Sequence, residues 1–132
     1  EGLQKGAYVM TDLGGKKPRL ILMASGSEVE LIINAGKQLA AEGIPVRLVS
    51  FPSWELFKQQ DKAYRDSVLL PDVKARVAVE AGTSLGWERW VGLDGGIVAV
   101  DHFGASAPNS VLFEKFGFNV ENILSVCMEV LL

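Results

Sequence analysis

The fold is decided by one stretch of the sequence, residues 20–43, which reads LILMASGSEVELIINAGKQLAAEG. Its first five residues form an unbroken apolar run, which is typical of a strand covered on both faces. A Ser-Gly-Ser turn at residues 25–27 ends the run, and Ser27 with Glu30 matches the capping box of a helix start. The apolar residues that follow recur at helical spacing. Because residues 44–50 predict the next strand, the stretch predicts a βαβ unit with parallel strands and a right-handed crossover.

Other segments extend this unit. Residues 7–10 predict a first strand, which should run antiparallel to the strand at residues 20–24 because the connection is short, though not necessarily beside it. Five strands with helices between them predict a single α/β domain over residues 1–132, with three layers in the order α/β/α. The remaining strands are expected at residues 75–80 and 96–100, and residues 101–104 leave the end of the second of these. Helices are expected after the caps Ser53, Asp61 and Asn119, and at residues 108–116.

Composition restricts the function classes. The 48% apolar residues and the mean hydropathy of +0.22 are high for a soluble domain, so we expect some apolar surface to be buried against another partner. A net charge of −3 with interspersed signs argues against nucleic acid as a partner, and no apolar run is long enough to span a membrane. The single cysteine, Cys127, fits a reducing, cytoplasmic compartment. A chain that begins at Glu1 is expected to be a fragment or a processed product.

Polar residues gather where the predicted strands end. Ligands of mostly parallel sheets bind at the carboxyl ends of the strands, and the turn at residues 25–27 offers free N–H groups to an anion. Against this interpretation, the capping box already satisfies those groups, Glu28 and Glu30 add negative charge, and no nucleotide-binding glycine pattern is present. Capping is therefore favoured over binding. The candidate anion site at this edge consists of Ser25, Gly26, Ser27, Glu80, Gly82 and His102.

Two further groups of residues could carry function. Glu80 and His102 could meet as an acid–base pair, although a lone histidine is more often a structural hydrogen-bonding group. One histidine and one cysteine make a metal site an unlikely interpretation. Trp54, Trp87 and Trp90 lie on or near short helices, where they are either edges of the core or anchors of an interface. Because the apolar content is high, we favour an interface for at least one of them.

Six segments carry a resemblance to a known family when they are taken in order. The segments are ASGSEVE (24–30), VSFPSWELF (49–57), QDKAYRDSV (60–68), ARVAVEAG (75–82), FGASAP (103–108) and FGFNVENI (116–123). With this ordered set, the chain resembles the C-terminal domain of transketolase over nearly its whole length from Tyr8 onward. The departures from the family pattern are small, such as a proline at position 71 where the family commonly places it one residue earlier.

The resemblance implies a Rossmann-like, five-stranded mixed sheet with four parallel strands and an antiparallel first strand. It also implies a parent enzyme that moves a two-carbon ketol unit from a ketose phosphate to an aldose phosphate. In that family thiamine diphosphate and a divalent metal, Mg or Ca, are bound by upstream domains across a homodimer interface. The Asp94-Gly95-Gly96 turn is not the family's diphosphate pattern. No catalytic, cofactor-binding or metal-binding residue is therefore expected on this chain, which we expect to be inactive alone.

Packing, dimer support and regulation remain as roles for such a domain. If a regulatory ligand binds, the crevice at Ser25 and Glu80 is where the fold would place it. Two alternatives stay open: a free-standing ligand-binding or assembly module, and the equivalent domain of a 2-oxoacid dehydrogenase β-subunit or deoxyxylulose-phosphate synthase. The segments at 53–57 and 103–108 favour transketolase over those relatives, and a separately encoded C-terminal half would give the same sequence.

Overall fold

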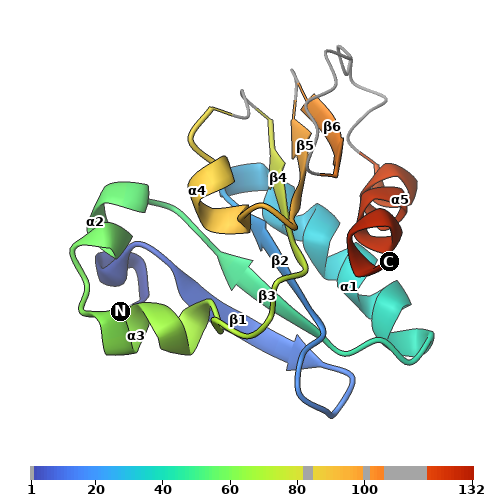
Figure 1. Cartoon of the computed structure of the whole chain (residues 1–132), viewed down its shortest axis with the longest axis horizontal. Helices are drawn as coiled ribbons and strands as arrows, with labels where there is room; N and C mark the ends of the chain where they lie inside the picture. Colours follow the sequence, from blue (N-terminus) through green and yellow to red (C-terminus); the bar gives the residue numbers. More distant parts are fainter. Residues whose placement is uncertain (1, 82–84, 100–101, 106–118) are drawn as a thin grey trace.

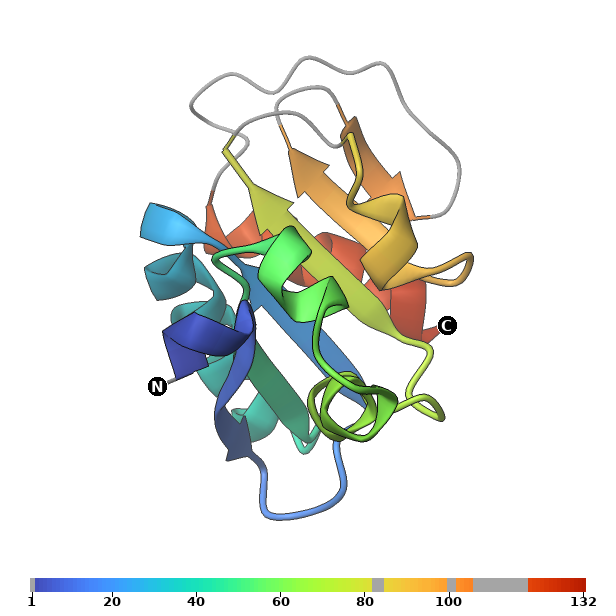
Figure 2. The ribbon, with the colours of Figure 1, turned by 90° about the vertical axis from the view of Figure 1, so that its left-hand side faces the viewer.

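The chain folds into three layers, with one sheet between two sets of helices (Figure 1). The computed structural model describes residues 2–81, 85–99, 102–105 and 119–132. On one face of the sheet lie the short helices α2 (Trp54–Lys58), α3 (Lys62–Val68) and α4 (Glu88–Val91), which stand in front of it in Figure 2. The other face is covered by the long helices α1 (Val29–Ala41) and α5 (Val120–Leu131). The predicted α/β/α layer order is confirmed.

The sheet has the strand order β1-β3-β2-β4-β5-β6. The strands β2, β3, β4 and β5 are parallel, and β1 runs antiparallel along β3. This arrangement confirms the predicted βαβ unit and the antiparallel first strand, which does not lie beside β2. The strands are β1 (Tyr8–Leu13), β2 (Leu20–Ala24), β3 (Val46–Ser50), β4 (Arg76–Glu80), β5 (Gly96–Ala99) and β6 (His102–Ala105).

The sixth strand was not predicted from the sequence. β6 pairs antiparallel with β5, from Ala99 opposite His102 to Gly96 opposite Ala105. Only two residues separate the paired strands, which is the length of a tight hairpin connection. Those residues are Val-Asp, which lack the Asn-Gly or Asp-Gly signal of such turns. The sequence therefore shows only that residues 101–104 leave the end of the fifth strand, and it carries no local sign that they pair with that strand.

Three of the predicted helix caps are confirmed. The side chain of Ser53 accepts from the Leu56 N–H at 3.2 Å, that of Asp61 from the Tyr64 N–H at 2.9 Å, and that of Asn119 from the Asn122 N–H at 2.8 Å. Each cap satisfies one of the backbone donors that the first helical turn leaves unpaired. The helix predicted at residues 108–116 lies outside the described residues.

The predicted start of α1 was wrong. A 3-10 turn, η2 (Gly26–Glu28), comes before the α-helix, and the N-cap residue is Glu28 rather than Ser27. Glu28 makes no side-chain capping hydrogen bond. The turn at residues 25–27 therefore continues into tighter helical geometry before α1 begins, so a capping-box pattern alone did not locate the first residue of the helix.

Both faces of the sheet are packed, as the unbroken apolar run predicted. Every residue of β2 is buried, with Ile21 and Met23 facing the short helices and the other three residues facing α1 and α5. Alternation of side chains along a strand sends successive residues to opposite faces. The chain therefore has its own two-sided core.

Cys127 gives this core a pH dependence that can be measured. Burial on α5 raises the pKa of the Cys127 thiol from 9.0 to about 12. Above pH 9 the unfolded chain loses the thiol proton while the folded chain keeps it, so stability is lost as the pH rises toward 12. We expect the Cys127 contribution to fall by about 1.4 kcal/mol per pH unit in this window. Urea unfolding of the wild type and of Cys127→Ala checks this, because their difference should shrink with rising pH. A constant difference would contradict the prediction.

Candidate functional site

The structure brings Ser25 and Glu80 together at the carboxyl edge of the sheet. Ser25 follows β2, Glu80 ends the adjacent strand β4, and the Ser25 hydroxyl donates to Glu80 Oε1 at 3.2 Å. The indole Nε1 of Trp87 donates to the same oxygen at 3.1 Å. The side chains of Ser27 and His102 and the whole of Gly82 lie outside the described residues. Of the predicted site, the structure thus brings together the side chains of Ser25 and Glu80, with Trp87 as an additional member. It also describes Gly26, which is exposed at the start of the neighbouring 3-10 turn.

This arrangement is better suited to a structural role, as a hydrogen-bonded group that supports the fold, than to anion binding. The Glu80 carboxylate occupies the crevice, and Glu28 at the end of the neighbouring turn is 9% exposed. Two carboxylates at the turn would oppose an anion that approaches the helix start. The Glu80 carboxylate instead provides the hydrogen-bond acceptor that the buried indole N–H of Trp87 requires, and this bond fixes the ring.

The tryptophans belong to an aromatic cluster on the side of the sheet that carries the short helices. Phe51 lies at its centre, with ring centroids 5.4 Å from Trp87, 5.0 Å from Trp90 and 5.1 Å from Phe57. Trp87 is 1% exposed and Trp90 is 7% exposed, whereas Trp54 is half-buried and packs edge-on against Trp87 at 5.2 Å. Of the two interpretations left open by the sequence, Trp87 and Trp90 follow the one that places them in the core.

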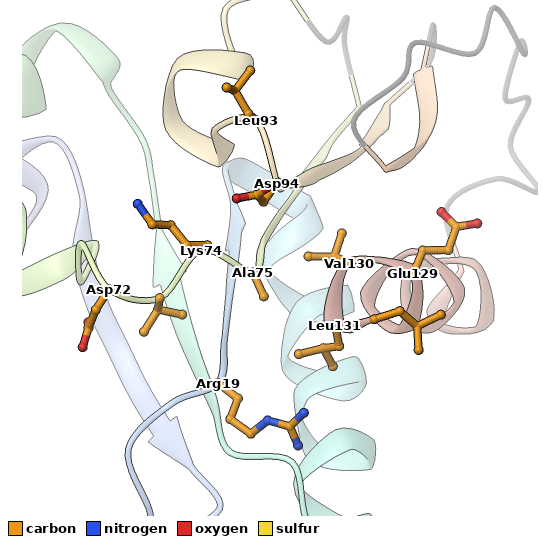
Figure 3. A pocket seen from close by; sticks show the side chains of 11 residues that line it. Arg19, Asp72, Lys74, Ala75, Leu93, Asp94, Glu129, Val130 and Leu131 are labelled. Carbon is orange, nitrogen blue, oxygen red and sulfur yellow. The ribbon is translucent and has the colours of Figure 1, made fainter.

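A pocket lies at the opposite, amino edge of the parallel strands (Figure 3). Its volume is about 580 Å³, and it lies between the start of β4, the loop before β5 and the end of α5. Its charged residues carry both signs, and the ends of Arg19, Lys74 and Glu129 point in different directions in Figure 3. A ligand site needs a few polar groups that converge, so this pocket has the size of a site without its chemistry.

The described part of the chain contains no group of three His, Cys, Asp or Glu side chains placed to hold a metal ion. Within that same part, no helix is both long enough and apolar enough to cross a membrane.

A comparison with protein families decides what kind of domain this is. Residues 6–119 match the model of the transketolase-like C-terminal domain. The chain belongs to the transketolase family. The match covers the sheet from β1 to β6, so the resemblance found in six separate segments extends over one continuous transketolase domain.

Individual transketolases agree with this assignment. The chain is 51% identical over 124 residues to the transketolase of Geobacillus stearothermophilus and 52% identical over 129 residues to transketolase 1 of Vibrio vulnificus strain YJ016. These alignments cover 94% and 98% of this chain, which spans only 19% of either relative. The solved transketolase of Leishmania mexicana superimposes with a TM-score of 0.79 at 42% identity, over 98% of this chain and 18% of that one.

Proposed function

We propose that this chain serves as the non-catalytic C-terminal domain of a transketolase. That enzyme transfers a two-carbon ketol unit from a ketose phosphate to an aldose phosphate, as in the pentose phosphate pathway. The observation that carries the proposal is the identity of about half of the residues to transketolases that are roughly five times longer. Thiamine diphosphate and a divalent metal would be bound by upstream domains, in the same chain or a partner chain, within a cytoplasmic homodimer.

The role of this domain would be to support packing and dimerisation of the parent enzyme. Large apolar side chains remain exposed on its surface, among them Leu85, at 79%, and Leu93, at 92%. Exposed leucines of this kind are stabilised when another domain or subunit covers them. The supporting role therefore rests on surface chemistry, whereas the parent activity rests on sequence identity.

A chimera tests the proposal. We expect ketol transfer to be retained when this chain replaces the matching segment of the Geobacillus stearothermophilus transketolase, because half of the residues and the fold are shared. Coupled spectrophotometric assay measures the transfer, and light scattering measures the dimer. A folded, dimeric chimera without transfer would contradict the proposal.

The isolated chain provides the complementary measurement. We expect no ketol transfer from it and no heat of binding with thiamine diphosphate in calorimetry. Turnover by the isolated chain would overturn the non-catalytic assignment. The mass of the native polypeptide then separates a long enzyme from a split one or a free-standing module.

A further inference from the structure

A second pocket lies among the short helices. It has a volume of about 320 Å³ and is lined by residues of α2, α3 and α4 and of the start of β4. Three of the five arginines in the chain line it, together with one aspartate and two aromatic side chains. We call it the arginine pocket, and its members used below are Phe57, Arg65, Asp66, Arg76, Arg89 and Trp90.

Arg76 supplies a positive charge that its hydrogen bonds do not neutralise. Its guanidinium donates to the carbonyl oxygens of Val73, Leu70 and Trp90, each at 3.0 Å. Carbonyl groups satisfy N–H donors but carry no net charge. Burial lowers the pKa of Arg76 below its ordinary value, and the negative charge of nearby Asp66 opposes that shift. The cation is thus held in place by neutral partners.

The aspartate of the pocket is already engaged. Asp66 Oδ2 accepts from the Lys62 ammonium at 2.6 Å, on the exposed side of α3. One carboxylate therefore stands against three arginines and a lysine, which leaves a surplus of positive charge around the pocket. Such a surplus attracts an anion.

Arg65 adds a donor without an acceptor. Its Nε is buried and donates to no acceptor among the described residues. An unpaired buried donor is costly, and a charged one more so, unless a ligand supplies the acceptor. At the rim, the Arg89 guanidinium lies 5.9 Å from the ring centroid of Trp90, so an aromatic ring backs this third, exposed arginine.

We propose that the arginine pocket binds a phosphoryl group, whose oxygens accept from Arg65 and Arg89 while Arg76 supplies fixed positive charge. Guanidinium groups bind phosphate oxygens through paired N–H donors, and several donors can share one tetrahedral anion. The buried Phe57 and Trp90 exclude water from one side of the pocket and so strengthen the attraction. This inference does not rest on the transketolase assignment, and it concerns a different edge of the domain from the Ser25–Glu80 crevice.

Arginine side-chain resonances provide the direct test. The ¹⁵N-labelled chain is titrated with inorganic phosphate and, separately, with glycerol 1-phosphate, against potassium chloride at equal ionic strength. We expect saturable shifts of the Nε–Hε signals of Arg65, Arg76 and Arg89, with one dissociation constant. Arg47, whose Nε already donates to Asp12 at 2.8 Å, should not shift. Tighter binding of the ester would identify a phosphorylated molecule as the ligand, and equal binding would identify the phosphate group alone.

Substitutions separate a built site from simple charge attraction. Arg65→Lys keeps the charge but removes the Nε donor, and we expect it to weaken phosphate binding about tenfold, the value of one charge-assisted hydrogen bond. Arg89→Gln, on the exposed rim, should weaken it without affecting folding. The control is Arg19→Gln in the pocket at the amino edge, which should leave the affinity unchanged. Equal weakening by the control, full affinity in Arg65→Lys, or no saturable shift with either phosphate would overturn the proposal.

Discussion

Replacement of Trp87 by alanine is expected to lower the free energy of unfolding by about 4 kcal/mol, the middle of the range for buried aromatic truncations. Trp87 is 1% exposed, packs edge-on against Phe51 and Trp54, and donates its indole N–H to Glu80 at 3.1 Å. The substitution would leave a cavity beside Phe51 in the aromatic cluster and remove a buried hydrogen bond. Urea unfolding followed by far-ultraviolet circular dichroism measures the loss.

Two matched variants separate the contributions. Trp54→Ala removes a half-buried ring from the same cluster and should cost about 1–2 kcal/mol, because the Trp54 ring buries less apolar surface in the folded chain than the Trp87 ring does. Trp87→Phe keeps most of the packing and removes only the hydrogen bond to Glu80. If Trp87→Ala left unfolding unchanged and altered only the association state by sedimentation, the assignment of Trp87 to the core would be wrong.

Replacement of Gly6 by alanine is expected to cost about 3 kcal/mol, because it combines backbone strain with overpacking. Gly6 has φ +87°, and a Cβ there would lie 2.3 Å from the Phe57 backbone nitrogen and 2.4 Å from the Ser53 carbonyl oxygen. The Gly6 carbonyl also accepts from the Ser53 N–H at 3.0 Å, so neither segment can withdraw without losing that hydrogen bond. Thermal and urea unfolding measure the effect.

Gly15 provides the control for this position. It has a similar φ of +73°, but a Cβ built there meets nothing within 4 Å. Gly15→Ala should therefore cost only about 1 kcal/mol, the conformational part of the penalty. If both variants lost the same stability, the close approach at Gly6 would contribute nothing, and the contact between the N-terminal segment and α2 would be looser than the structure shows.

The parts of the fold that the sequence predicted correctly are those encoded locally. The apolar run of β2 and the helical periodicity of α1 lie within 22 residues of one another, and a βαβ unit has only one common handedness. The caps Ser53, Asp61 and Asn119 each act on a backbone group three residues away. The prediction of where α1 starts was wrong because it used only a local cap signal, which cannot distinguish an α-helical first turn from a 3-10 turn.

The candidate site was predicted less completely. Strand ends on one edge of the sheet correctly placed Ser25 near Glu80, although the two residues lie 55 positions apart. No pattern in the sequence links Trp87 to that pair or predicts three arginines around one pocket. Arg65 and Arg76 looked like ordinary charged residues on a helix and a strand, and no motif links them.

By itself, the sequence determined the family, the α/β class, the parallel strand direction and most helix caps, because these depend on periodicity and on neighbours within a few residues. Only the tertiary structure decided which tryptophans are buried, that a sixth strand joins the sheet, and that Arg76 is held by carbonyl groups from two separate segments. Those features depend on the register of the strands and the packing of α3 and α4 against them. The local conformational propensities of the residues do not specify these features, because contacts between residues far apart in the sequence form only when the core packs.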